Sequence, residues 1–342
     1  MGSLQPVSTT WRHASRSSYI AVPIIPKHLR RINRNVYGEM LIERDIERIW
    51  FGCGNFGGIG SSPRLLSAGD SEQQALRLLD HARRVGLRRF DTANTYGGGA
   101  SEIVLGKWLD DQGASFMQDA QIATKVGNPH GCPPGDTPLS KTQIVWHLDQ
   151  SLQRLGVERI DLYYIHEFDR VTPLEETLEA MSAAADAGKI DRFGISNASL
   201  SDVQEVRSLA GDTLESRFEY VENEFNLFAT ADLDELIPCC AEHGLRYTAF
   251  SPLAGGLLTG KYRFGEEPPS NSRLAHAGDM YKNYLNAKSF AAIEQLRQSA
   301  EARQQSISEA ALHFVLDTPG IDGLIIAPRT IEQFESQGFG RQ

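Results

Sequence analysis

Short apolar runs and longer helix-like runs alternate strictly along the chain from residue 46 onward. The apolar runs are rich in Ile, Val, Phe and Tyr, which is typical of buried strands. Eight of them are expected as strands, at about residues 49–52, 88–91, 122–126, 162–166, 193–197, 220–225, 247–251 and 323–327. Eight strand–helix units in this order predict an α/β fold, a single-domain (β/α)8 TIM barrel.

The intervening runs predict the outer helices of such a barrel. Glycine follows several of them, as expected at helix ends: Gly86, Gly156, Gly188 and Gly244. Helices are predicted at about residues 71–85, 101–110, 141–155, 174–187, 200–209, 233–242, 290–303, 308–316 and 331–336. Residues 263–279 are polar and contain proline, so a long excursion is expected after the seventh strand.

Composition narrows the classes of function. The formal net charge is −10, which disfavours nucleic acid or an anionic membrane as the main partner. No apolar run reaches the roughly 20 residues that a membrane-spanning helix needs. The four cysteines form no C-x-x-C pair, so we expect a reduced compartment and no metal site.

Residues 1–45 differ from the rest of the chain and are predicted to be an N-terminal extension. No acidic residue occurs before Tyr37, and arginines are scattered among serines, a composition typical of transit peptides. Pro23 and Pro26 would interrupt the amphipathic helix that such a peptide needs. An irregular extension and a cytoplasmic protein are therefore favoured over organellar targeting, and residues 46–342 are assigned to the barrel, with a truncated last helix.

Two motifs point to other folds and are rejected. Residues 52–57 match G-x-G-x-x-G, but a dinucleotide-binding fold needs a helix to start inside that motif. The glycines and Pro63 that follow prevent this, so we interpret the segment as the first barrel loop, close to a ligand. Tyr284 and Lys288 form a Y-x-x-x-K pair outside any Rossmann pattern, which chance explains better.

In a (β/α)8 barrel, active sites lie at the carboxyl ends of the strands. Polar residues are expected at those ends in this chain: Asp91, Lys125, His166, Ser196, Asn197, Glu222, Ser251 and Arg329. Taken singly, each has an ordinary structural explanation, such as a snorkelling lysine or a satisfied buried histidine. Several titratable types that converge on one barrel mouth favour a catalytic site instead.

The first of these residues suggest proton transfer to a carbonyl oxygen. Lys125 ends an apolar strand, and Asp91 at the neighbouring strand end can neutralise it. The lysine is expected to lower the pKa of Tyr96, in the glycine-rich turn after Asp91, and so make it a usable general acid. His166 can hydrogen-bond the substrate oxygen.

With these residues in place, the chain resembles the aldo-keto reductase family over about residues 46–337. The resemblance is carried by residues 91–97, 124–126, 159–166, 188–197 and 250–262. It implies a catalytic tetrad of Asp91, Tyr96, Lys125 and His166. It also implies NADPH as the usual cofactor, a small-molecule carbonyl as substrate, and a dinucleotide site without a Rossmann fold.

The resemblance places the cofactor residue by residue. Ser196 and Asn197 would hold the nicotinamide carboxamide, with Glu222 at the usual glutamine position, and Phe250 would stack on the nicotinamide ring. Four residues would line the pyrophosphate: Ser251, Leu253, Gly255 and Lys261. Arg329 and Gln333 would lie by the adenosine 2′-phosphate, and a guanidinium there favours NADP over NAD.

The chain also departs from the family pattern. Glu222 replaces an amide by a carboxylate, which can accept a hydrogen bond from the carboxamide but cannot donate one. Phe168 replaces a frequent proline, and Ser336 and Gln337 replace the acid and asparagine that commonly contact adenine. The eighth helix is expected to be short, which leaves the substrate mouth more open.

Three functions remain after these observations. The leading hypothesis is an NADPH-dependent enzyme that reduces an aldehyde or ketone to an alcohol. The second is an NADP-binding regulatory or auxiliary subunit with little turnover, as in the channel β-subunit branch of the family. The third is a specialised biosynthetic role, reducing a ketone, imine or conjugated bond in a bulky intermediate. The sequence leaves the substrate open, and a monomer and a homo-oligomer are equally compatible with it.

Overall fold

The computed structural model describes residues 45–66, 68–133, 136–210 and 212–340. Their eight parallel strands form a closed barrel in which each strand pairs with the next and β8 pairs with β1. The strands are β1 Ile49–Gly52, β2 Arg89–Asp91, β3 Gln121–Val126, β4 Ile160–Ile165, β5 Ile190–Ser196, β6 Phe218–Glu224, β7 Arg246–Phe250 and β8 Ile321–Ile326. The predicted TIM barrel is therefore confirmed.

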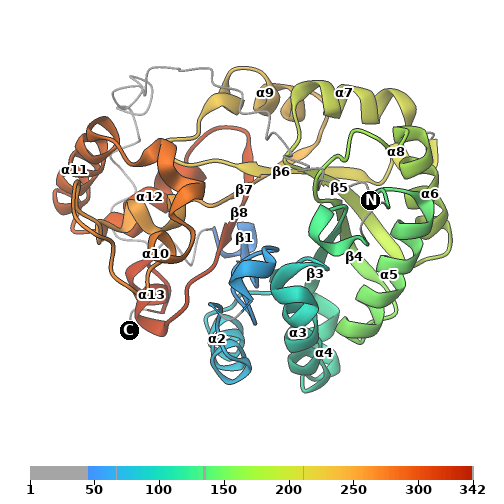
Figure 1. The fold of residues 1–342 in the computed structure, drawn as a ribbon, viewed down its shortest axis with the longest axis horizontal. Helices are drawn as coiled ribbons and strands as arrows, with labels where there is room; N and C mark the ends of the chain where they lie inside the picture. Colours follow the sequence, from blue (N-terminus) through green and yellow to red (C-terminus); the bar gives the residue numbers. More distant parts are fainter. Residues whose placement is uncertain (1–44, 67, 134–135, 211, 341–342) are drawn as a thin grey trace, which may run out of the picture.

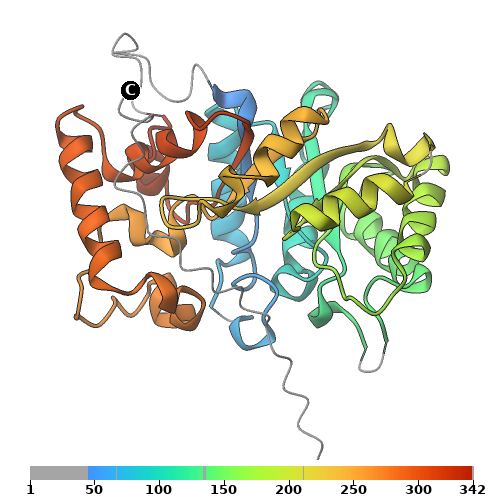
Figure 2. The same cartoon turned by 90° about the horizontal axis from the view of Figure 1, so that it is seen from above.

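Helices surround the strands. They are α2 Glu72–Arg84, α3 Ala100–Asp110, α4 Ala114–Asp119, α5 Lys141–Leu155, α6 Leu174–Asp186, α7 Leu200–Leu209, α8 Asp212–Glu215, α9 Leu236–Glu242, α10 Arg273–Ala277, α11 Ala287–Glu301, α12 Ile307–Leu316 and α13 Ile331–Ser336. Figures 1 and 2 show α10–α13 on one side of the strands and α5–α8 on the other. Gly156 takes the left-handed conformation that ends α5, as predicted.

Several helical segments of the described residues were not predicted. α4 is a short helix before β3, and α8 is a single turn before β6. The polar excursion after β7 contains α10 and the 3-10 segment Gly278–Tyr284. Short helices of this kind carry too few turns to leave a readable hydrophobic period, which explains why the sequence pattern did not indicate them.

The barrel interior has an apolar layer below a polar one. Side chains alternate along a strand, so residues two apart face the same side. Ala123 and Tyr220 belong to the apolar cluster inside the barrel. Lys125 and Glu222, two residues further along the same strands, are also buried and lie above that cluster. The alternation that fills the core thus delivers charged groups to the carboxyl end of the barrel.

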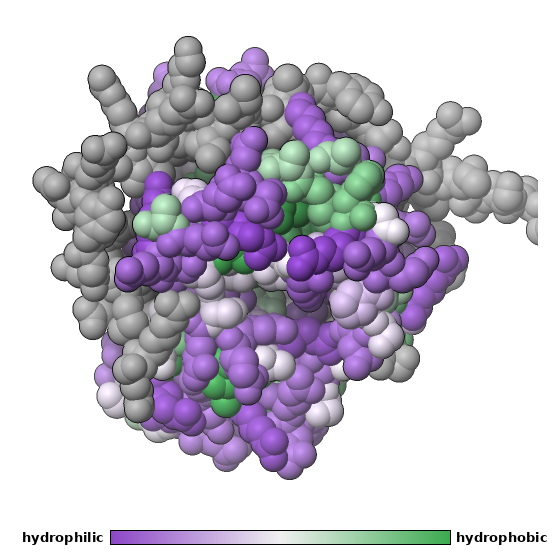
Figure 3. All heavy atoms as spheres, turned by 90° about the vertical axis from the view of Figure 1, so that its left-hand side faces the viewer, coloured by the Kyte–Doolittle hydropathy of each residue, from purple (hydrophilic) through white to green (hydrophobic). Residues whose placement is uncertain are grey.

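One face of the molecule is mostly polar and carries a smaller hydrophobic patch (Figure 3). The face that carries α10–α13 shows mostly hydrophilic side chains where residues are described (Figure 3). Among the described residues, no helix combines the length and apolarity that would let it cross a membrane. The predicted extension, residues 1–45, falls outside the described residues except for Asp45, so the division into extension and barrel stays a prediction.

Candidate active site

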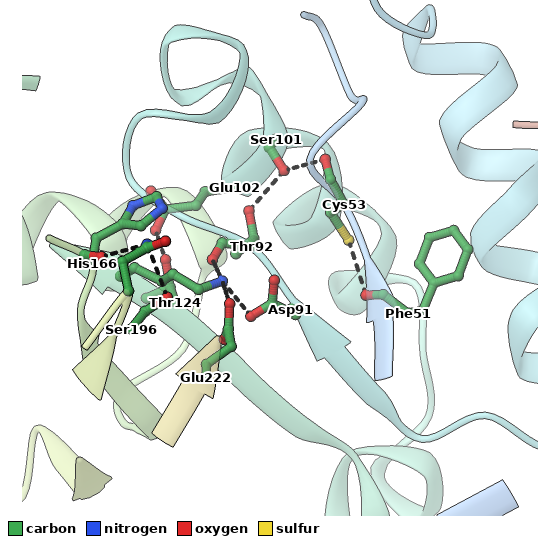
Figure 4. A network of polar contacts seen from close by, with 12 residues as sticks. Phe51, Cys53, Asp91, Thr92, Ser101, Glu102, Thr124, His166, Ser196 and Glu222 are labelled. Atoms are coloured by element: carbon green, nitrogen blue, oxygen red, sulfur yellow. Dashed lines mark hydrogen bonds and ion pairs between the residues drawn. The ribbon is translucent and has the colours of Figure 1, made fainter. Parts of the chain in front are cut away.

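Lys125 lies at the centre of the site. Its side chain is fully buried, and its Nζ lies 2.5 Å from Asp91 Oδ2. The same ammonium lies 3.4 Å from Glu222 Oε1 and donates a hydrogen bond of 3.1 Å to the carbonyl oxygen of Thr92. Figure 4 shows Asp91 and Glu222 converging from different strands. The predicted Asp91–Lys125 pair is therefore present, and the contact with Glu222 was not anticipated.

Tyr96 lies over this charged group. Its ring centroid is 5.3 Å from Lys125 Nζ, and its ring meets the His166 ring edge-on at 5.6 Å between centroids. Tyr96 begins the turn Tyr96–Gly99, in which Gly97 has a φ of 59°. A Cβ on Gly97 would lie 2.2 Å from the carbonyl oxygen of Phe56. Only glycine allows the turn to pack so closely and bring Tyr96 to the barrel mouth.

A buried chain of hydrogen bonds holds the Tyr96 turn against the barrel. The hydroxyl groups of Thr92 and Ser101 lie 2.7 Å apart, and Ser101 donates to the carbonyl oxygen of Cys53 at 2.9 Å. Thr92 directly follows β2, Ser101 belongs to α3 and Cys53 follows β1 (Figure 4). The turn between β2 and α3 is therefore tied at both ends to the first two strands.

Burial sets the protonation states of the tetrad. Burial would lower the pKa of Lys125, but the carboxyl groups of Asp91 and Glu222 reverse this and raise its pKa, so it is an ammonium. Burial also raises the pKa of Asp91, and Lys125 opposes this. Burial lowers the pKa of His166 to about 3, and Lys125 adds to this effect, so the imidazole is neutral near pH 7.

The predicted lowering of the Tyr96 pKa is wrong as a net effect. Burial raises the pKa of Tyr96, and the opposing influence of Lys125 is smaller. Asp91 and Glu222 raise the pKa further, because their carboxyl groups cancel part of the lysine's positive potential. Tyr96 is therefore held as the phenol, which is the form that can donate a proton.

Two buried polar atoms in this region lack a partner within the part of the chain that the structure describes. Among the described residues, neither His166 Nδ1 nor Glu222 Oε2 has a hydrogen-bond partner. An unpaired buried polar atom costs about 1–3 kcal/mol, so each favours a bound partner. The positions are consistent with a substrate oxygen at His166 and a carboxamide at Glu222.

The residues predicted to hold the nicotinamide lie together at the ends of β5–β7. Ser196 and Glu222 are register partners, and Asn197 follows directly. The amide of Asn197 donates to the carbonyl oxygen of His166 at 3.0 Å and to Ser196 Oγ at 3.3 Å. Phe250 packs against the apolar cluster inside the barrel. Asn197 thus fixes the histidine backbone, a role that the sequence did not indicate.

The loop after β7 contains several residues in the left-handed backbone conformation. Ser251, Ala254, Gly255 and Gly256 all have φ between 47° and 91°. Residues with a left-handed backbone conformation, next to residues with a right-handed one, can form concave nests of N–H groups that bind phosphates. A Cβ on Gly255 would lie 2.4 Å from the Tyr281 ring, so no larger residue fits there.

All four residues predicted to line the pyrophosphate, Ser251, Leu253, Gly255 and Lys261, lie in or beside this loop. Leu253 directly precedes the 3-10 segment Ala254–Thr259. The ammonium of Lys261 lies close to Gly256: a Cβ added to this glycine would be 3.1 Å from Lys261 Nζ. The N–H groups of Ala254 and Gly256 already donate to Ser251 and Leu253 within the loop, so the Lys261 ammonium is the group here that could attract a phosphate.

Arg329 has a partner that the sequence did not indicate. Its Nε donates to Asp70 Oδ1 at 2.7 Å, and its backbone N–H donates to Gln333 Oε1 at 2.8 Å. Asp70 is buried, whereas the Arg329 side chain remains 29% exposed. The guanidinium is therefore oriented by Asp70 and still accessible to an anion. Burial raises the pKa of Asp70, although Arg329 opposes this.

A further arginine reaches the same region. Arg273 donates to Asn55 Oδ1 at 3.2 Å and to the Tyr281 hydroxyl at 3.3 Å. Asn55 in turn contacts the carbonyl oxygen of Ala327, two residues before Arg329. Arg273 lies in the polar excursion, where sequence reasoning found no informative residue; a lone arginine at a helix start carried no signal.

The rejected motifs behave as predicted. No helix begins within residues 52–57, and α2 starts only at Glu72. Gly54 lies beside the Tyr96 ring, since a Cβ there would be 3.5 Å from it. Tyr284 donates to Glu224 Oε1 at 3.1 Å, and Lys288 is the second residue of α11. Among the described residues, no group of His, Cys, Asp and Glu could hold a metal ion.

Comparisons with known proteins agree with this geometry. Residues 48–337 match the model of the Aldo/keto reductase family. The chain is 31% identical over 264 residues to the L-glyceraldehyde 3-phosphate reductase of Escherichia coli K12, covering 75% of this chain and 76% of that protein. It is 33% identical over 261 residues to a probable voltage-gated potassium channel subunit beta of Oryza sativa, covering 74% and 77%. The glycerol dehydrogenase structure from Gluconobacter oxydans shares the fold, with a TM-score of 0.70 and 24% identity over 86% of each chain.

Proposed function

The chain belongs to the aldo/keto reductase family of oxidoreductases, and from this premise we propose that it reduces an aldehyde or ketone to an alcohol with NADPH. The observation that carries the proposal is the buried Lys125, 2.5 Å from Asp91 and 5.3 Å from the Tyr96 ring, with His166 edge-on to that ring. This arrangement can protonate an oxygen that becomes negative.

NADPH, when bound, supplies the hydride that reaches the carbonyl carbon. Tyr96 donates its phenolic proton to the carbonyl oxygen, and solvent protonates the phenolate afterwards. An alkoxide is a stronger base than a phenolate, so a tyrosine with a raised pKa can still protonate it. Neutral His166 donates an N–H to the same oxygen and orients it. Lys125 stabilises the phenolate, and Asp91 keeps the lysine charged and in place.

The cofactor preference is part of the proposal. We assign the pyrophosphate to the loop of residues 251–256, where Lys261 supplies a positive charge. Arg329, oriented by Asp70, suits a 2′-phosphate better than a hydroxyl, because a guanidinium binds phosphate with charge-assisted hydrogen bonds. We assign the adenosine end of NADP to Arg329 and Gln333, with Arg273 as an added positive charge nearby.

An absorbance assay of NADPH oxidation tests the proposal. The purified chain is mixed with NADPH and a panel of aldehydes and ketones, including phosphorylated aldehydes, because one relative is an L-glyceraldehyde 3-phosphate reductase. We expect turnover with at least one carbonyl. Absence of turnover across the panel, from protein that binds NADPH, would count heavily against a carbonyl reductase.

The similarity to a probable potassium channel β subunit supports a second candidate, an NADP-binding auxiliary subunit. The two candidates differ in the rate of hydride transfer. Tight NADP binding, very slow single-turnover oxidation of bound NADPH, and a stable partner in a pull-down would favour the subunit. Multiple turnovers with a carbonyl would favour the enzyme. Reduction of a bulky biosynthetic intermediate remains a subclass of the enzyme proposal, and larger ketones in the panel address it.

A further inference from the structure

Two buried carboxyl groups share one ammonium at the centre of the site. Lys125 Nζ lies 2.5 Å from Asp91 and 3.4 Å from Glu222. All three side chains are at least 95% buried. One positive charge can neutralise one carboxylate, and a second buried carboxylate without a cation is costly. The charge count therefore favours a proton on one of the two carboxyl groups near neutral pH.

Glu222 is the carboxyl group that fits this role. It is further from the ammonium than Asp91, and a side-chain hydrogen bond links the two carboxyl groups, which requires a proton on one of them. Burial and the neighbouring Asp91 raise the pKa of Glu222 to about 8, against the opposing effect of Lys125. Its partners in the strand register, Ser196 in β5 and Thr248 in β7, carry no charge. Among the described residues, four titratable groups interact with Glu222. They are Asp91 on β2, Tyr96 in the turn after β2, Lys125 on β3 and Tyr164 on β4.

The charge of Glu222 acts on Tyr96. Lys125 contacts both residues, which places Glu222 within about 9 Å of the tyrosine ring. An ionised Glu222 opposes formation of the phenolate, because Asp91, Glu222 and the phenolate would then be three negative groups around one cation. At such a distance and an effective dielectric constant of about 20, the influence on Tyr96 corresponds to about one pH unit.

We propose that Glu222, once ionised, holds Tyr96 as the phenol, so that the site disfavours alcohol oxidation relative to carbonyl reduction. The proposal rests on the proposed function. In reduction, the phenol gives its proton to the carbonyl oxygen as hydride leaves NADPH for the carbon. In oxidation, a phenolate must take the alcohol proton while hydride passes to NADP⁺. An ionised Glu222 disfavours the phenolate and therefore slows alcohol oxidation.

The pH profile of alcohol oxidation tests the proposal. We compare the wild-type chain with Glu222→Gln, which keeps the shape and removes the charge. We expect the midpoint of the oxidation profile to fall by about one pH unit, which means about tenfold faster oxidation on the rising part of the profile. Glu224→Gln is the matched control, since Glu224 lies on the same strand but contacts Tyr284 and Asn226. Equal midpoints for wild type and Glu222→Gln would overturn the proposal.

A second readout needs no turnover. The phenolate absorbance of Tyr96, obtained as the difference between each chain and its Tyr96→Phe derivative, gives the ionisation midpoint directly. Glu222→Gln is expected to lower this midpoint, and an unchanged midpoint contradicts the proposal. If no carbonyl is reduced, the proposed function fails, yet this titration still decides whether Glu222 controls Tyr96. Should Glu222→Gln not fold, Glu222→Ser removes the same charge.

Discussion

Asp91 and Glu222 reach the same ammonium from opposite strands of the barrel, β2 and β6. Lys125, on β3, is the cation between them, and its side chain is fully buried. The three groups depend on one another, because loss of the cation leaves two carboxyl groups buried without a partner. This relationship links the stability of the barrel to the chemistry at its mouth.

Lys125→Met should therefore destabilise the fold as well as abolish activity. Removal of one partner from a buried ion pair costs about 3–5 kcal/mol, and the cost should shrink at low pH, where both carboxyl groups take up protons. Urea unfolding at neutral and acidic pH measures this. Lys107→Met is the control, because Lys107 pairs with Glu72 on the surface, where such pairs contribute about 0–1 kcal/mol. Equal effects of the two substitutions would contradict a shared cation.

Because burial lowers the pKa of His166, we expect the fold to lose stability in acid. Its pKa is about 3 in the folded chain, below the usual 6.5, so the unfolded chain binds a proton between these values and the folded chain does not. Stability from this residue is present above about pH 6.5 and declines as the pH falls toward 3. His166→Gln should show a smaller drop in melting temperature between neutral and mildly acidic pH. Parallel pH curves for both chains would argue against a neutral buried imidazole.

Arg329 and Asp70 should change cofactor choice in opposite directions. Arg329→Leu removes the charge-assisted hydrogen bonds to a 2′-phosphate, so the NADPH affinity should fall by about tenfold or more while the NADH affinity changes little. Asp70→Asn removes the competing carboxylate and should strengthen NADPH binding. Fluorescence titration with each cofactor measures both. Arg303→Leu, at an exposed position, serves as the control; similar losses for NADPH and NADH in Arg329→Leu would exclude a 2′-phosphate contact.

The hydrogen bonds of Ser101 predict a local effect on the Tyr96 turn. Ser101→Ala leaves Thr92 Oγ1 and the carbonyl oxygen of Cys53 without this partner, so the free energy of unfolding should fall by about 1–3 kcal/mol. Catalysis should also fall while NADPH binding persists, because the turn between β2 and α3 is less firmly held. Denaturant unfolding and steady-state kinetics measure the two effects. Unchanged stability would show that the chain of hydrogen bonds contributes little.

The architecture was predictable because it follows from local sequence patterns, namely the spacing of apolar residues and the residues that end helices. The strand–helix unit repeats eight times, glycine stops such as Gly156 mark several helix ends, and several bounds match closely, including Leu200–Leu209 and Ile331–Ser336. The short helix Ala114–Asp119 and the helix within the excursion, Arg273–Ala277, were missed because they leave no readable period.

The site was only partly predictable, because its contacts depend on closure of the barrel. Adjacent strand ends suggested the Asp91–Lys125 pair correctly. The approach of Glu222 to Lys125 comes from strands that are not neighbours, and the Arg329–Asp70 pair joins residues far apart in the chain. The pKa of Tyr96 depends on burial, which a sequence shows poorly, and burial outweighs Lys125.

Single-turnover measurement of bound NADPH oxidation, for wild type and Tyr96→Phe, tests the central claim most directly. With a carbonyl that the wild type reduces, Tyr96→Phe should lose at least about 10²-fold in the rate of hydride transfer, the usual contribution of a general acid. Its affinity for NADPH should stay close to that of the wild type, since the phenol hydroxyl is not among the proposed cofactor contacts. Equal rates for the two proteins would contradict the assignment of Tyr96 as the acid.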